Sequence, residues 1–191
     1  RTGILSIMTY AFGHANAWHL IGNMWALVVF GTPVNRRLGD GYYLIAYLAS
    51  AVFVGLCAKL FSPYGLIGAS GATNAVIAMC ALLFAGSFIR IFYFAVFPIT
   101  LIVGLLKPPP TFAFWFIRWD VFRTRVVWWC FIFVPLLQIW HLCWWLKYGV
   151  WHWTYLAHLL GFVCGIGIAL LLPAHISKGR GATGSTRSGK A

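Results

Sequence analysis

Long apolar runs with almost no charge are the feature that most constrains this chain. Five of them, residues 17–34, 42–61, 71–89, 126–146 and 153–172, are long enough to cross a bilayer core as helices, which takes about 20 residues each. Of the 191 residues, 62% are hydrophobic and 8% are charged, which is more apolar surface than a water-soluble core can bury. The sequence therefore predicts an all-α polytopic membrane protein, a helical bundle with about five transmembrane helices.

The basic residues predict how the chain is oriented in the membrane. There are 14 Lys and Arg against two acidic residues, which gives a net charge of +12. If the loops 31–41 and 90–125 share one side with the C-terminal tail, most of the basic residues gather there: Arg36, Arg37, Arg90, Lys107, Arg118, Arg123, Arg125, Lys178, Arg180, Arg187 and Lys190. The other side keeps only Arg1, Lys59 and Lys147. This positive-inside pattern predicts a cytoplasmic C-terminus near anionic membrane lipid, and it explains the charge without nucleic acid as a partner.

The segment 90–125 is predicted to be a cytoplasmic connection that lies partly in the membrane interface. Its apolar run, residues 91–106, is shorter than the other five, and a full crossing there would turn the basic tail outward. The tail is rich in Gly, Ser, Thr and Lys, a composition typical of disorder. The expected organisation is a membrane domain over 1–173 followed by a disordered, basic cytoplasmic tail over 174–191.

The scarcity of acidic residues excludes several kinds of chemistry. Asp40 and Asp120 are the only acids, both in predicted cytoplasmic loops, and the chain has no glutamate. Paired-carboxylate catalysis within the membrane and an HExxH zinc site are therefore excluded, and a carboxylate-supported serine triad is disfavoured. The five cysteines lie inside the predicted spans without CxxC spacing, so we expect them to pack as small apolar side chains. Serine, histidine, asparagine and the backbone remain as sources of catalysis.

Polar residues in or beside apolar spans are costly and mark candidate functional positions. Three groups occur: His14, His19 and Asn23; Gly68, Ser70 and Gly71; and His158, Gly161 and Gly165. The i, i+4 spacing places His19 and Asn23 on one helical face. With the C-terminus in the cytoplasm, the alternation of spans brings all three groups to one depth, toward the outer face.

Together these residues suit acyl transfer. A serine hydroxyl becomes a nucleophile when a neighbouring base takes its proton, and histidine is the usual partner. The small-xxx-small pair on the last span permits close helix packing, which could bring His158 to Ser70. The side chains of His19 and Asn23 and the amide of Ser70 are candidate donors to a developing oxyanion.

Each group also has a plainer interpretation. Ser70 could cap the helix that follows it, because serine is a favoured N-cap residue. The glycine pair could serve packing alone, and a membrane histidine could be packed or could line a proton path.

The order and spacing of the three groups resemble the rhomboid family of intramembrane serine proteases. The resemblance covers about residues 5 to 173 and rests on three motifs: Gly68-Ala69-Ser70-Gly71, His19-x-x-x-Asn23 two spans earlier, and His158-x-x-Gly161-x-x-x-Gly165 on the last span. It implies that Ser70 is the nucleophile and His158 the general base, with no metal or cofactor. It also implies that His19 and Asn23 form the oxyanion hole with the Ser70 amide, that Gly68 permits the sharp backbone beside it, and that His14 is structural.

The resemblance further implies an endopeptidase that cleaves single-pass transmembrane proteins near the outer membrane face, here expected in a bacterial inner membrane. The family core has six helices, and this chain is expected to begin after the first. Two alternatives stay open: a non-catalytic rhomboid-like protein that binds transmembrane helices as an adaptor or chaperone, and a small transporter. The presence of both Ser70 and His158 argues against the first, and the convergence of the polar groups at one depth argues against the second.

Overall fold

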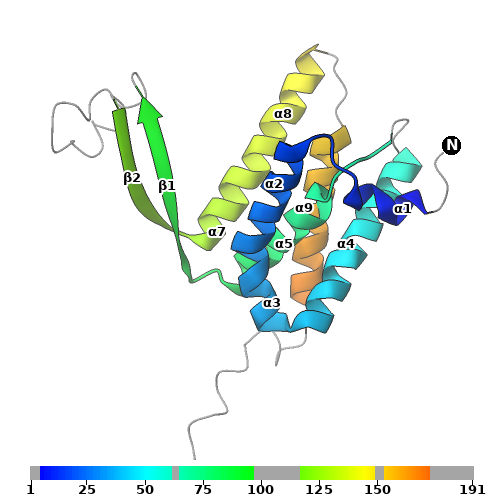
Figure 1. Ribbon diagram of the computed structural model, residues 1–191, viewed down its shortest axis with the longest axis horizontal. Coiled ribbons are helices and arrows are strands. Elements are labelled where there is room, and N and C mark those ends of the chain that lie inside the picture. Colours follow the sequence, from blue (N-terminus) through cyan, green and yellow to red (C-terminus); the bar gives the residue numbers. More distant parts are fainter. Residues whose placement is uncertain (1–4, 62–64, 97–116, 149–152, 173–191) are drawn as a thin grey trace, which may run out of the picture.

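The computed structural model describes residues 5–61, 65–96, 117–148 and 153–172 of the chain (Figure 1). The described helical elements are α1 (Ser6–Thr9), the 3-10 turn η1 (Tyr10–Phe12), α2 (Ala17–Ala26), the π-helical η2 (Leu27–Gly31), α3 (Thr32–Leu38), α4 (Asp40–Phe61), α5 (Ser70–Leu83), α7 (Val126–Trp128), the π-helical η4 (Trp129–Phe133), α8 (Val134–Tyr148) and α9 (Trp153–Leu171). Two strands, β1 (Phe88–Val96) and β2 (Ile117–Arg125), extend from one side of the helical bundle (Figure 1). The tail predicted over 174–191 lies outside the described residues.

The central helix of the bundle is α5. Its residues 71–81 are all buried, and α9, α4 and η2 pack around it. With 14 residues it is about 21 Å long, shorter than the ~30 Å hydrocarbon core of a bilayer. α5 alone is therefore too short to cross the hydrocarbon core.

Among the described residues, three helices are long and apolar enough to cross a membrane: Asp40–Phe61, Val126–Trp144 and Trp153–Leu171. These helices confirm the predicted class of helical membrane protein. The predicted number of about five transmembrane helices is not confirmed by length and hydropathy. The first predicted span is helical from Ala17 to Leu38 but changes to π-helical turns over η2. The third is a shorter apolar helix that ends at Leu83.

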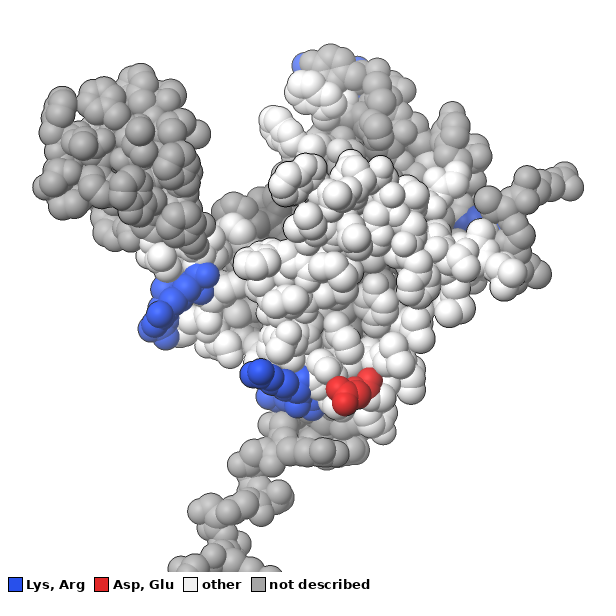
Figure 2. Space-filling model, viewed as in Figure 1, with Lys and Arg blue, Asp and Glu red and all other residues white. Residues whose placement is uncertain are grey.

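Large apolar side chains cover much of the outside of the bundle. Trp18 is 81% exposed, Leu60 66% and Leu170 73%. Such surfaces favour aggregation in water, whereas lipid tails solvate them. The visible face of the bundle is largely uncharged, and its larger basic patches lie beside the hairpin and at the turn between α3 and α4 (Figure 2). Two further lysines lie in the last turns of α4 and α8.

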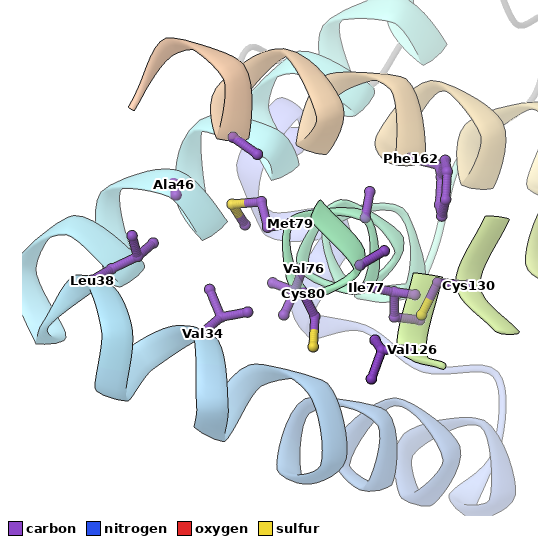
Figure 3. Close-up of a cluster of buried hydrophobic side chains, with 13 residues drawn as sticks. Val34, Leu38, Ala46, Val76, Ile77, Met79, Cys80, Val126, Cys130 and Phe162 are labelled. Carbon is purple, nitrogen blue, oxygen red and sulfur yellow. The ribbon is translucent and has the colours of Figure 1, made fainter. Parts of the chain in front are cut away.

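Two apolar clusters hold the helices together. The larger one joins α3, α5, η4 and α9 through side chains that include Val34, Val76, Met79, Cys130 and Phe162 (Figure 3). The smaller one surrounds the first turn of α5 and consists of Tyr10, Ala11, Ala51, Val54, Ala72 and Ala157. Because the smaller cluster joins α4, α5, α9 and η1, it fixes the end of α5 at which Ser70 lies.

The contact between α5 and α9 is made by backbone. A Cβ atom placed on Gly161 would collide with the carbonyl of Gly71, and one placed on Gly165 would collide with the carbonyl of Ala75. Glycine at both positions of α9 therefore allows the two helix backbones to touch at two points about one turn apart.

The hairpin is a feature that the sequence did not predict. β1 and β2 pair antiparallel, with Phe88 opposite Arg125 and Val96 opposite Ile117. The helix predicted over 71–89 is therefore wrong beyond Leu83, and the described parts of 90–125 are mostly strand. Both strands are rich in aromatic and β-branched residues, which favour a pleated backbone. Short apolar runs of this kind fit helix and strand equally well by periodicity, so the sequence pattern did not separate them.

Candidate active site

Ser70 is the first residue of α5 and follows a tight turn. Gly68 has a φ of +114°, a conformation that side chains rarely permit, and its N–H donates to the carbonyl of Tyr10 at 2.9 Å. The buried hydroxyl of Tyr10 donates in turn to the carbonyl of Ala51 at 2.9 Å, and burial raises the pKa of that hydroxyl, so it stays protonated. The N-cap position of α5 is Ala69, so the interpretation of Ser70 as the N-cap is wrong.

The structure brings Ser70 and His158 into direct contact. Oγ of Ser70 and Nε2 of His158 lie 2.7 Å apart, within hydrogen-bond distance. His158 lies on α9 one turn before Gly161, where the two backbones meet, so the helix contact sets the level of its ring. A short bond of this kind between hydroxyl and imidazole is the geometry of an activated serine nucleophile.

A third residue, which sequence reasoning missed, completes this chain of contacts. Oε1 of Gln138 on α8 lies 3.0 Å from Nδ1 of His158, and the glutamine is 8% exposed. Gln138 is the only glutamine of the chain and lies in an apolar run. The rule that polar side chains inside membrane spans are functional could have singled it out, although no spacing links it to the other motifs.

The first polar group lies beside the same turn. Asn16 caps α2 by accepting the backbone N–H of His19, and Ala15 N–H points at Nδ1 of the His19 ring at 3.5 Å. A Cβ on Gly68 would lie 2.5 Å from Cε1 of His19 and 2.8 Å from Nε2. With Nδ1 facing a donor, the ring carries its proton on Nε2, which faces the turn that leads to Ser70.

Asn23 lies one turn further along α2 and is buried. One N–H of its side-chain amide donates to the carbonyl of His19 at 2.9 Å, and an amide nitrogen has a second N–H to offer. On α5, the amide of Asn74 donates to the carbonyl of Ser70 at 2.8 Å. Both asparagines thus brace the backbone on which the candidate site residues stand.

His14 lies against this group, and its buried Nε2 has no hydrogen-bond partner among the described residues. Its ring meets the ring of His19 edge-on, with 5.2 Å between the centroids. His141 stacks on Tyr155 with 4.4 Å between the ring centroids, and the Tyr155 and His158 rings lie perpendicular with 6.4 Å between their centroids. These rings pack around the candidate site, and among the histidines it is His158 that lies within hydrogen-bond distance of Ser70.

Gly71, next to Ser70, allows close packing of α4 against the start of α5. A Cβ on Gly71 would lie 2.9 Å from a methyl group of Val54, so α4 packs tightly on the turn as well. In the described parts of the chain, no group of three or more His, Cys, Asp or Glu is arranged to hold a metal ion. The groups gathered here are a hydroxyl, an imidazole with an acceptor behind it, and several N–H donors.

Comparisons with known proteins point to one family. The model of the rhomboid domain matches residues 1–117, which include His19, Asn23 and Ser70 and end before His158. The rhomboid protease GluP of Bacillus subtilis is 42% identical over 59 residues, and the mitochondrial Rhomboid protein 1 of Saccharomyces cerevisiae is 35% identical over 102 residues. The two matches cover 31% and 50% of this chain, and only 12% and 30% of the respective relatives. No solved structure matches the chain significantly.

Proposed function

Because this chain belongs to the rhomboid family, whose domain model matches more than half of it, we propose that it is an intramembrane serine endopeptidase acting through Ser70 and His158. The observation that carries the proposal is the 2.7 Å contact between the Ser70 hydroxyl and Nε2 of His158. It lies at one end of a helix shorter than the bilayer core and is surrounded by apolar helices. A site of this kind suits a peptide bond that is itself within or beside the membrane.

The proposed reaction begins with attack of Ser70 Oγ on the carbonyl carbon of the scissile peptide bond. The hydroxyl proton passes to Nε2 of His158, and the carbonyl oxygen becomes an oxyanion. When the C–N bond breaks, the imidazolium returns that proton to the leaving amine and an acyl ester remains on Ser70. Water then attacks the ester, His158 takes a proton from the water, and the proton restores the Ser70 hydroxyl as the new carboxyl product leaves.

The oxyanion would be held by groups around the turn. The first four N–H groups of a helix have no acceptor within the helix, and Ser70 is the first residue of α5. Nε2 of His19 lies beside the turn at Gly68, and Asn23, one turn further along α2, has a second amide N–H to offer. We assign these three donors to the oxyanion hole, and we assign Gly68 to the backbone conformation that lets His19 approach.

The substrates we propose are single-pass transmembrane proteins cleaved near the outer face of a bacterial inner membrane. Arg36 and Arg37 end α3, about 25 Å along the helical path from His19 at 1.5 Å per residue. The strands that carry Arg90, Arg123 and Arg125 follow the far end of α5. These five arginines therefore lie at the opposite end of the bundle from Ser70, while Lys59 and Lys147 lie in the last turns of α4 and α8. This unequal distribution supports the proposal that Ser70 faces outward and the C-terminus is cytoplasmic, because cytoplasmic loops carry the excess of Lys and Arg.

The test is a cleavage assay with the full chain in liposomes and a single-pass transmembrane substrate carrying a small-residue segment near one end of its helix. Wild type is expected to release a soluble fragment, and Ser70→Ala and His158→Ala are each expected to abolish release. Ser87→Ala, a serine outside the site, is the matched control and should leave cleavage unchanged. Binding of the substrate without cleavage by wild type would instead support the adaptor function.

A further inference from the structure

We propose that Gln138 is a positioning residue for His158 and takes the place that a carboxylate has in a serine triad. The inference rests on the proposed function. Gln138 and Ser70 contact opposite nitrogens of the same ring, at 3.0 Å and 2.7 Å. The three residues come from three helices, α8, α9 and α5, so their alignment is a property of the fold.

The chemistry of the contact determines the state of the ring. A glutamine amide oxygen only accepts hydrogen bonds, so the Nδ1 atom that faces it carries the proton. In a neutral imidazole the other nitrogen is then an acceptor, and that nitrogen is the one on Ser70. Gln138 therefore selects the tautomer in which Nε2 can take the serine proton, and it holds the ring plane in line with Oγ.

The composition of the chain makes this role distinctive. A serine triad normally orients its histidine with a carboxylate, yet the chain has no glutamate and its two aspartates lie at positions 40 and 120, outside this site. Gln138 is buried, so its amide oxygen would go unpaired in an apolar surrounding without the imidazole N–H. The same bond thus satisfies the buried amide and orients the base.

Gln138 also assists when the ring is charged. After His158 has taken the serine proton, both of its nitrogens carry hydrogen, and the amide dipole of Gln138 faces the Nδ1–H of the imidazolium. A fixed acceptor at this point stabilises the charge that forms during the reaction without adding a permanent negative charge inside the membrane.

The experiment measures kcat and KM of substrate cleavage in liposomes for four variants of the full chain beside wild type and Ser70→Ala. Gln138→Met keeps the side-chain length and removes the acceptor, and Gln138→Asn keeps an amide that is one carbon too short to reach. Gln138→Glu retains an acceptor oxygen whether or not it is ionised. Ile139→Met places the same new side chain on the neighbouring, exposed position of α8 and is the matched control.

We expect Gln138→Met and Gln138→Asn to lower kcat by about tenfold or more, the scale of a misplaced general base, with KM unchanged. Gln138→Glu should recover kcat to within a few fold of wild type, and Ile139→Met should match wild type. Wild-type kcat in Gln138→Met and Gln138→Asn, or a Gln138→Glu enzyme as slow as Gln138→Met, would overturn the positioning role while leaving the Ser70 chemistry intact. An inactive wild type would instead overturn the proposed function and this inference together.

Discussion

At the scale of single residues, the backbone at Gly68 is what lets the candidate site form. Its φ of +114° turns the chain into α5, and its missing side chain leaves room for the His19 ring. The same residue ties the turn to η1 through the carbonyl of Tyr10. Gly68 thus couples the position of Ser70 to that of a proposed oxyanion donor.

Replacing Gly68 by alanine should therefore damage the site twice. The left-handed backbone conformation costs about 1–3 kcal/mol for a residue with a side chain, and the new Cβ would lie 2.5 Å from Cε1 of His19. We expect cleavage to fall at least tenfold and the thermal midpoint in detergent to drop. Gly65→Ala is the matched control, because an added Cβ meets nothing within 4 Å there. Equal activity of the two variants would contradict this role of Gly68.

Most of these residues could be predicted from the sequence, because the motifs gave their spacing and the alternation of spans gave their common depth. Ser70, His158, His19 and Asn23 were expected at one depth, and the structure brings Ser70 and His158 to hydrogen-bond distance while His19 lies beside the turn. Gln138 could not be placed in this way. Its bond to His158 joins two helices. The direction in which a single amide side chain points depends on how the helices pack, and no sequence motif indicates that packing.

At the scale of helices, the pairing of α5 with α9 decides whether the serine meets its base. The contact runs through Gly161 and Gly165 against the backbone of Gly71 and Ala75. A displacement of α9 by the thickness of one methyl group would lengthen the Ser70 contact to His158 beyond a hydrogen bond.

This leads to opposite expectations for two glycines of the same helix. Alanine is intrinsically better than glycine within a helix by about 1 kcal/mol, so Gly167→Ala, where an added Cβ meets nothing within 4 Å, should be neutral or stabilising. At Gly161 the same change forces α9 away from α5, and overpacking of this kind costs about 1–3 kcal/mol. We expect Gly161→Ala to lower the thermal midpoint and to reduce cleavage at least tenfold. A Gly161→Ala enzyme as active as Gly167→Ala would contradict the backbone contact.

Hydropathy predicted three helices with their limits and misplaced the end of another. The apolar character of 42–61, 126–146 and 153–172 indicated helices that the structure places within two residues of those limits. The apolar run of the third span continues through Phe88 and Ile89, so hydropathy predicts a helix up to residue 89. In the structure these two residues belong to β1, and what stabilises β1 is a partner strand that begins at residue 117. Pairing across that separation leaves no local signal in the sequence.

At the scale of the whole molecule, the charge distribution and the position of the site support the proposed orientation. The bundle is apolar outside, and the larger basic patches of the visible face lie at the α3–α4 turn and beside the hairpin (Figure 2). Ser70 begins α5, and the hairpin follows the other end of that helix. Membership of the rhomboid family agrees with this arrangement of an integral membrane protein.

The orientation can be tested with introduced cysteines and a membrane-impermeant maleimide on intact cells. Gly65→Cys, beside Ser70, should react from outside, and Gly41→Cys, at the start of α4, should react only after the membrane is permeabilised. Both glycines are exposed and have open space around them, so neither change should disturb the fold. Wild type, with its five free cysteines, gives the background to be subtracted. Labelling in the reverse order would contradict the proposed topology.

The central claim is that His158 activates the Ser70 hydroxyl, and covalent labelling of that hydroxyl tests it most directly. The full chain in liposomes would be treated with a fluorophosphonate, and the modified residue would be identified by peptide mass spectrometry. We expect one label on Ser70 in wild type, none in Ser70→Ala, and a rate at least a hundredfold lower in His158→Ala, since general-base assistance contributes about 10² to 10⁴ in rate. Labelling of Ser70 at the same rate without His158, or no labelling of Ser70 in a folded wild type, would contradict the account.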